Sequence, residues 1–300
     1  MRPLVRPRTR RAPCSLLLMT LATYEVSTLR SSMVGEAPPL LILHGLLGSA
    51  RNFRSWSAAL APALQKPRRV YSVDLRNHGA SFQADTMSYA EQAEDVLATM
   101  DALGVDRAAI LGHSMGGKVA MAMALARPDR VDRLCVFDIA PAPYSVADSS
   151  NWRASRDLML ALQELREADL ADRRTADNAL ARRVLDPNIR AFALANLEQV
   201  PGSAALRWKC NLDALVCNLD VVAGWALVAA APAPAAMYPG AALFVAGGNS
   251  RYVRSAHLRD ISALFPRFTL ETIPQTGHWI HAEAPEKTVD AARRFLDADL

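Results

Sequence analysis

The stretch GHSMG at residues 112–116 places Ser114 between two glycines, with a short apolar run before it at 108–111 and a helical run after it at 117–127. A serine at a sharp turn between a strand and a helix is typical of a nucleophile elbow, which exposes the hydroxyl at the start of the helix. The glycines relieve the steric clashes that the strained backbone of such a turn creates. The stretch therefore predicts Ser114 as a nucleophile, if the chain also supplies a base, an acid and an oxyanion hole.

A serine hydroxyl attacks poorly at neutral pH and needs a base within hydrogen-bond reach. The predicted base is His278, which stands in a turn just after the predicted strand 268–271. His281, three residues further on, is the one rival. The remaining histidines are expected to have supporting roles: His44, His78 and His113 at turns, and His257 at the surface.

Strand and helix patterns alternate from about residue 38, which predicts a parallel sheet covered by helices on both faces. Strands are predicted at 40–43, 70–73, 108–111, 134–137, 243–245 and 268–271, and helices at 53–64, 89–103, 117–127 and 286–296. Between residues 141 and 238 the alternation gives way to helical periodicity with many charges and no convincing strand. A helical insertion in an α/β frame is typical of a lid over the crevice at the carboxyl ends of the strands.

The predicted organisation has three parts. An N-terminal extension with an edge strand occupies residues 1–37, an α/β core is formed by 38–140 and 239–300, and a helical lid spans 141–238. A chain of 300 residues with 51% hydrophobic content can bury a core of this size.

Charge and cysteine content narrow the function classes. The chain has 34 basic and 30 acidic residues, and five of the basic ones are arginines within residues 1–18, so no nucleic-acid-binding surface is indicated. Four cysteines are scattered at positions 14, 135, 210 and 217, fit no metal spacing, and indicate reduced thiols in an intracellular protein. No apolar run is long enough to cross a membrane.

Residues 1–18 are rich in arginine and contain no acidic residue, and two interpretations of them stay open. An organellar transit peptide would place the protein in the mitochondrial matrix or that of another organelle. If these residues are instead an upstream artefact and translation begins at Met19, the protein is expected to be soluble in the cytoplasm. A secretory signal fits less well, because no small-residue cleavage site is clear.

From about Leu40 to its C-terminus the chain resembles the α/β-hydrolase superfamily, most closely the α/β-hydrolase domain-containing protein 11 group and its small bacterial esterase counterparts. The resemblance is carried by HGLLGS at 44–49, DLRNHG at 74–79, GHSMGGK at 112–118, DIAP at 138–141, NLDAL at 211–215, GGNS at 247–250 and GHWIH at 277–281. It implies the α/β-hydrolase fold, a mostly parallel twisted sheet with helices on both faces and a helical lid. It also implies short to medium acyl esters or thioesters as substrates.

The acid departs from the usual pattern of this superfamily. Most members carry it just after the strand that corresponds to 243–245, but here no Asp or Glu occurs between Asp220 and Asp260. Asp138 is the predicted acid, because it ends the preceding strand at the same sheet edge, and some members place the acid there. A carboxylate that follows four apolar residues is costly to desolvate unless it is paired. Asp213, in the lid motif 211–215, is the alternative.

The oxyanion hole is expected to consist of two backbone N–H groups, from Met115 after the nucleophile and from Leu46 in the glycine-containing turn 44–48. Aromatic side chains of the lid would either line an apolar acyl pocket or hold the lid helices together: Tyr144, Trp152, Trp208 and Trp225. The sequence contains no recognisable metal site or nucleotide-binding loop, and no cofactor is predicted.

These residues predict a serine hydrolase that cleaves esters or thioesters of small acyl substrates through an acyl-enzyme intermediate. A serine nucleophile argues against the dehalogenase and epoxide-hydrolase branches, which need a carboxylate. Two alternatives remain at this point: a hydrolase or lyase acting on C–C bonds with the same residues, and a catalytically silent α/β-hydrolase that binds a ligand or partner.

Overall fold

The computed structural model describes residues 20–26, 37–147, 149–203, 205–225 and 237–299. Both interpretations of residues 1–18 therefore concern a segment outside the described residues.

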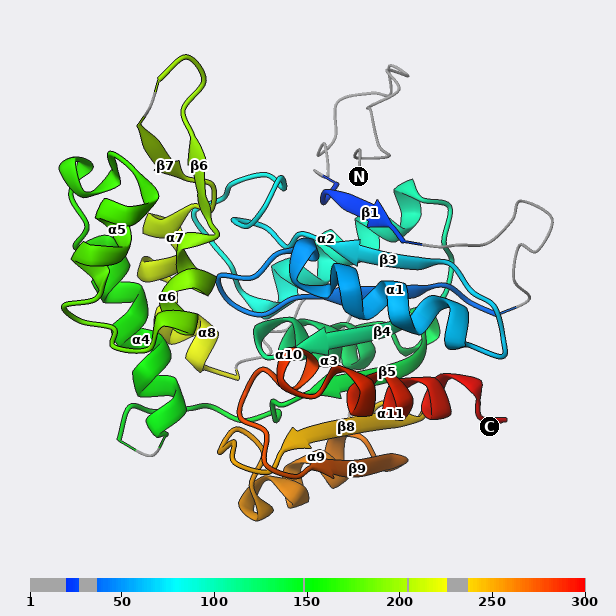
Figure 1. Cartoon of the computed structure of the whole chain (residues 1–300). Helices are drawn as coiled ribbons and strands as arrows, with labels where there is room; N and C mark the ends of the chain where they lie inside the picture. Colours follow the sequence, from blue (N-terminus) through cyan, green and yellow to red (C-terminus); the bar gives the residue numbers. More distant parts are fainter. Residues whose placement is uncertain (1–19, 27–36, 148, 204, 226–236, 300) are drawn as a thin grey trace.

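Seven strands form one sheet in the order β1-β3-β2-β4-β5-β8-β9 (Figure 1). Their bounds are β1 Thr23–Glu25, β2 Leu40–Leu43, β3 Val70–Val73, β4 Ala108–His113, β5 Val131–Phe137, β8 Ala242–Gly247 and β9 Phe268–Ile273. Neighbouring strands pair in parallel, except that β1 pairs antiparallel with β3 at the edge.

Helices cover both faces of this sheet (Figure 1). One face carries α1 (Arg54–Ala63) and α11 (Pro285–Asp297), and the other carries α2 (Tyr89–Ala102), α3 (Met115–Ala126) and α9 (Leu258–Leu264). Successive strand residues point to opposite faces, so the continuous apolar strands supply two separate hydrophobic cores. The predicted parallel sheet with helices on both faces is confirmed.

The chain between β5 and β8 forms an insertion beyond the carboxyl ends of the parallel strands (Figure 1). It contains the helices α4 Ser150–Gln163, α5 Arg173–Leu180, α6 Pro187–Leu194, α7 Leu212–Cys217 and α8 Leu219–Ala223, with a short 3₁₀-helix, η3, at Glu167–Leu170. The prediction that the insertion lacks strands is wrong, because β6 (Leu197–Gln199) and β7 (Leu206–Trp208) form an antiparallel pair. Strands of three residues are too short for alternation to reveal them in the sequence.

Shorter elements complete the described chain: the 3₁₀-helices η1 (Ala50–Phe53), η2 (Pro128–Arg130) and η4 (Ser255–His257), and the single turn α10 (Ile280–Glu283). None of the helices in the described ranges combines the length and the apolar character that a bilayer crossing requires. Cys135, Cys210 and Cys217 carry free thiols, and Cys14 lies outside the described residues.

Backbone strain is concentrated at one edge of the sheet. Five non-glycine residues in the described ranges have positive φ, and each follows the carboxyl end of a different parallel strand: Leu47 after β2, Asn77 after β3, Ser114 after β4, Asp138 after β5 and Gln275 after β9. Such conformations cost about 1–3 kcal/mol each and persist only where the surroundings enforce them. The strained edge is therefore the place to look for a functional site.

Candidate active site

Ser114 occupies a strained turn between β4 and α3, with φ 53° and ψ −120°. A Cβ on Gly112 would lie 2.2 Å from the Gly116 carbonyl oxygen, and one on Gly116 would lie 2.5 Å from the carbonyl oxygens of Leu43 and His44. Both positions therefore require glycine, because any side chain would force β4, α3 and the end of β2 apart. The residues on either side of Ser114 are buried and the serine is partly exposed, so the turn presents its hydroxyl at the surface of a cavity.

The structure brings Ser114, His278 and Asp138 into one hydrogen-bonded chain. The Oγ of Ser114 lies 2.9 Å from Nε2 of His278, and Nδ1 of His278 lies 2.7 Å from Oδ2 of Asp138. The carboxylate can only accept, so Nδ1 carries a proton and Nε2 of the neutral ring is free to accept from the serine. Asp213, the alternative acid, is exposed in the first turn of α7, and the carboxylate at Nδ1 is that of Asp138.

Asp138 has 0% exposed surface, and the turn after β8 supplies the donors that its burial requires. The Gly247 amide donates to Oδ1 at 3.0 Å, and the Ser250 hydroxyl donates to Oδ2 at 2.5 Å. This is the turn in which most superfamily members are expected to carry the acid. Here the turn contains no Asp or Glu, and its residues instead donate to the carboxylate of Asp138, which follows the neighbouring strand.

The loop that carries His278 is fixed by three further contacts. His113 donates from Nε2 to the His278 carbonyl oxygen at 2.9 Å, and its ring lies 4.7 Å from the His278 ring. The Glu283 carboxylate accepts from the amides on both sides of His278, those of Gly277 and Trp279. A Cβ on Gly247 would lie 2.0 Å from the Gly277 carbonyl oxygen, so this glycine lets the loop approach the end of β8. The ring of His278 is thereby held over the serine.

Two buried histidines hold the loop that contains Leu46. His44 accepts from the Leu75 amide through Nε2 at 3.0 Å, and His78 accepts from the Leu47 amide through Nε2 at 3.2 Å. The Gly48 amide donates to the Gly45 carbonyl oxygen at 2.9 Å. The amides of Leu47 and Gly48 are thus satisfied within the fold. Leu46 lines the same cavity as Ser114 and Met115, and Met115 is the first residue of α3, where an N–H has no partner within the helix.

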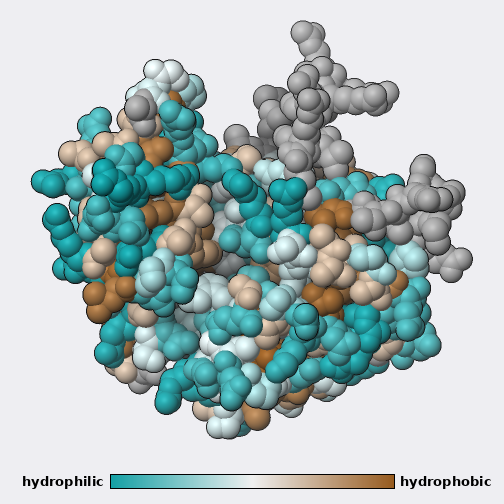
Figure 2. Space-filling model, viewed as in Figure 1, coloured by the Kyte–Doolittle hydropathy of each residue, from teal (hydrophilic) through white to brown (hydrophobic). Residues whose placement is uncertain are grey.

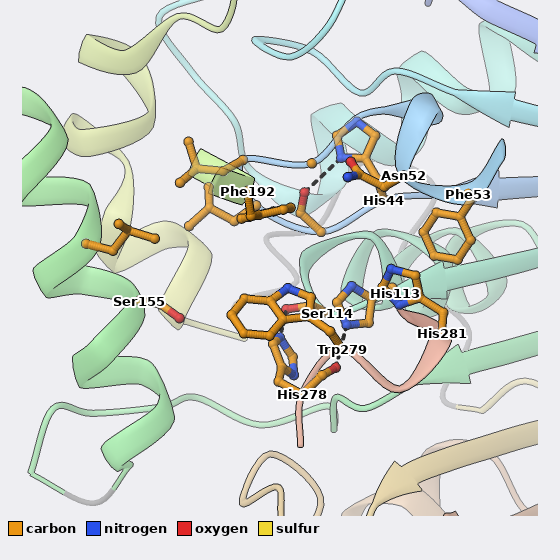
Figure 3. A pocket seen from close by; sticks show the side chains of 15 residues that line it. His44, Asn52, Phe53, His113, Ser114, Ser155, Phe192, His278, Trp279 and His281 are labelled. Atoms are coloured by element: carbon orange, nitrogen blue, oxygen red, sulfur yellow. Dashed lines mark hydrogen bonds between the residues drawn. The ribbon is translucent and has the colours of Figure 1, made fainter. Parts of the chain in front are cut away.

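Ser114 lies between two cavities that share Leu46 and Ser155. The larger, of about 550 Å³, is lined by residues that include His278, Trp279 and Phe192, and Figure 3 shows Ser155 reaching toward it from α4. The smaller, of about 330 Å³, is lined by aromatic and apolar side chains of the core and the insertion: Tyr89, Met115, Ile139, Tyr144, Trp152, Val222 and Tyr252. Figure 2 shows hydrophobic residues at the boundary between insertion and core.

Lys118 lies on α3 one turn after the serine and is buried at the wall of the smaller cavity. Its Nζ donates to the three carbonyl oxygens of 222–224 at the end of α8, at 3.3, 2.9 and 2.6 Å, and lies 4.8 Å from the centre of the Tyr144 ring. Burial lowers the pKa of Lys118 to about 7, whereas the carbonyls and the ring favour the charged form. This link between α3 and the insertion has no signal in the sequence.

The other predicted residues separate into two groups. Tyr144 and Trp152 line the smaller cavity, whereas Trp208 lies in β7 and Trp225 packs near Tyr89, 6.1 Å between ring centres. The prediction that His257 is exposed is wrong, because η4 buries its ring against Tyr144. No cluster of His, Cys, Asp or Glu in the described ranges has an arrangement that could hold a metal ion.

Comparison with known proteins shows the family of this chain. The family model described as alpha/beta hydrolase fold matches residues 38–285. The chain belongs to the α/β-hydrolase family. The match includes β4, the turn at Ser114, β5 and the loop that carries His278.

Individual α/β-hydrolases resemble the chain along most of its length. The sn-1-specific diacylglycerol lipase ABHD11 of Mus musculus is 38% identical, over 86% of this chain and 81% of its own. Esterase YbfF of Escherichia coli K12 is 34% identical, over 86% of this chain and 93% of its own. The solved structure of a marine microorganism esterase is 32% identical, with a TM-score of 0.83 over 92% of this chain and 99% of its own. The predicted resemblance to the protein 11 group and its bacterial counterparts is confirmed.

The buried histidines around this α/β-hydrolase site predict a loss of stability in acid. Burial lowers the pKa of His44 to about 4, and that of His78 and His281 each to about 3. An unfolded histidine takes up its proton near pH 6.5, well above these values. Between about pH 6.5 and pH 4 the unfolded chain therefore binds more protons than the folded protein, and the free energy of unfolding falls as the pH is lowered.

His281 provides the test, because its ring stacks on Phe53 at 4.3 Å and Nδ1 has no hydrogen-bond partner among the described residues. We expect His281→Phe to keep an aromatic ring there and to remove one titrating group. Urea denaturation at about pH 7 and about pH 5 measures how far the free energy of unfolding falls between the two conditions. The fall should be smaller in the variant than in the wild type by about 2 kcal/mol. An equal loss in both proteins would contradict the prediction.

Proposed function

We propose that this α/β-hydrolase is a serine hydrolase that cleaves ester or thioester bonds of small acyl substrates through an acyl-enzyme intermediate. The observation that carries the proposal is the continuous chain of hydrogen bonds from the Ser114 hydroxyl through His278 to Asp138. Nucleophile, base and acid stand in hydrogen-bond reach in the order that acyl transfer requires. Relatives named lipase and esterase over most of the chain support the same class of reaction.

Each group has a definite task in this mechanism. Oγ of Ser114 attacks the acyl carbonyl carbon while Nε2 of His278 takes the hydroxyl proton, and Asp138 stabilises the imidazolium through Nδ1. The negative oxygen of the tetrahedral intermediate accepts from the Leu46 and Met115 amides, each worth about 3 kcal/mol in such sites. His278 then protonates the leaving alcohol or thiol. In the second half it deprotonates a water that attacks the acyl-enzyme, and Oγ regains its proton.

The two cavities beside Ser114 suggest how a substrate is divided between them. We assign the acyl chain to the smaller cavity, because aromatic and apolar side chains line it and α8 closes it at Lys118. The leaving alcohol or thiol then occupies the larger cavity toward Trp279. Both cavities include residues of the 141–238 insertion, such as Trp152 and Phe192, which supports a role for the insertion as a lid.

A fluorophosphonate probe tests whether Ser114 is the nucleophile. We expect covalent labelling of the wild type, and no labelling of Ser114→Ala, because the probe reacts only with an activated serine hydroxyl. The same two proteins are assayed on a panel of acyl esters and thioesters of increasing chain length. A folded wild-type protein that neither reacts with the probe nor hydrolyses any ester or thioester would favour the ligand-binding alternative. Cleavage of C–C bonds without cleavage of esters would favour the C–C hydrolase or lyase.

The acid is tested by comparing Asp138→Asn with Asp213→Asn. We expect Asp138→Asn to lower kcat by about 10³- to 10⁴-fold, because an amide cannot hold the required tautomer of His278 or stabilise its cation. Asp213→Asn should stay near wild-type activity, since that side chain is exposed on α7. Circular dichroism and thermal unfolding check that both variants are folded. A larger loss in Asp213→Asn would refute the assignment.

Acyl-chain selection is tested at Trp152. We expect Trp152→Ala to lengthen the smaller cavity and raise the kcat/KM of a long-chain ester relative to that of a short-chain one by about tenfold. Trp208→Ala is the matched control, because Trp208 also belongs to the insertion but lies in β7, outside the lining of either cavity. The same change of preference in both variants would show that the cavity does not select the chain.

A further inference from the structure

A third cavity, of about 710 Å³, continues outward from the proposed active site. It lies between η1 and the insertion helices α5 and α6. It shares Leu47, Asn52 and Phe192 with the cavity that we assign to the leaving group. The two cavities adjoin, so a leaving group longer than the first would reach the second.

The lining of this third cavity is cationic. It includes Arg51 and Arg173, together with the polar residues Ser49, Asn52 and Asn196, and it includes no Asp or Glu. Some arginines of the insertion are paired with a carboxylate outside this cavity, such as Arg183 with Glu164 and Arg190 with Asp177. Neither Arg51 nor Arg173 forms an ion pair with a carboxylate of the described residues.

Arg173 is held in place by backbone carbonyl oxygens and not by a carboxylate. NH1 donates to the carbonyl oxygen of Leu194, the last residue of α6, and NH2 to that of Leu197, the first residue of β6, both at 2.6 Å. Carbonyl oxygens fix the plane of the guanidinium, while its remaining N–H groups stay available as donors. The Asn196 side chain, which donates to the Leu47 carbonyl oxygen at 2.8 Å, ties this part of the insertion to the loop that contains Leu46.

We propose that this cavity binds a phosphate group carried by the alcohol or thiol part of the substrate. The inference rests on the proposed esterase function and adds the class of leaving group to it. Guanidinium groups bind phosphate oxygens through paired, charge-assisted hydrogen bonds, and an arginine on each side of the cavity suits a group with several acceptor oxygens. The inner cavities offer no comparable site, because their lysine, Lys118, already donates to three carbonyls.

The experiment compares substrates in pairs that differ in the phosphate. One pair is a butyryl thioester of coenzyme A and the same thioester of N-acetylcysteamine, and the other is a 1-acyl glycerol 3-phosphate and the matching 1-acyl glycerol. We expect the wild type to prefer the phosphate-bearing member of at least one pair by about tenfold or more in kcat/KM, through a lower KM. The pair that shows the preference identifies a thiol or a glycerol carrier.

Two variants and two controls complete the test. Arg51→Gln and Arg173→Gln should each reduce the phosphate preference about tenfold, and added salt should reduce that of the wild type. Arg54→Gln and Arg174→Gln remove exposed neighbouring charges that do not line the cavity, and should keep the preference. Equal effects in all four variants, or no preference in the wild type, would overturn the proposal.

A binding measurement separates this proposal from the proposed function. Calorimetric titration of Ser114→Ala with each member of the two pairs requires no turnover. Tighter binding of a phosphate-bearing member, lost in the double variants Ser114→Ala/Arg51→Gln and Ser114→Ala/Arg173→Gln, supports the site even if no ester is hydrolysed. Equal binding of both members of each pair refutes the site, whether or not the wild type is an esterase.

Discussion

The Asp138 carboxylate has no exposed surface, and a buried negative charge is costly unless donors surround it. Its donors are the Gly247 amide, the Ser250 hydroxyl and the His278 ring, from segments more than a hundred residues away along the chain. The carboxylate is satisfied only when β5, β8 and the loop after β9 are all in place. The same contact therefore stabilises the fold and aims His278 at Ser114.

The strained backbone at the ends of the strands is the second part of this arrangement. Leu47, Ser114 and Asp138 all have positive φ, and each stands where a parallel strand ends. A buried parallel sheet with a hydrophobic core on each face is rigid enough to enforce these positive-φ conformations, which an isolated loop would not keep. Neutral buried histidines then fix the loops: His44 and His78 accept from backbone amides, which a charged ring could not do, and His113 donates to the His278 carbonyl oxygen.

The sheet and its helices could be predicted because their signals are local and repeated. The apolar runs at 40–43 and 108–111 are strands, and the helix predicted at 89–103 begins at a Ser88–Glu91 capping box. The short pair β6–β7 and the burial of Lys118 and His257 escaped prediction. Those features depend on partners far away along the chain, so no local pattern encodes them.

By itself the sequence predicted the fold class and singled out Ser114 and His278, because glycine spacing, strand pattern and chain order restrict the possible turns. It kept His281 as a rival for the base, and the structure stacks that ring on Phe53 while His278 lies at Ser114. It left two candidates for the acid, Asp138 and Asp213. Only the tertiary structure placed Asp138 at the ring and Asp213 on an exposed helix. It alone also brought Arg51 and Arg173 to one cavity. The physical reason is that the partner of a charged side chain depends on which distant segments pack together, and the spacing of residues along the sequence does not specify that packing.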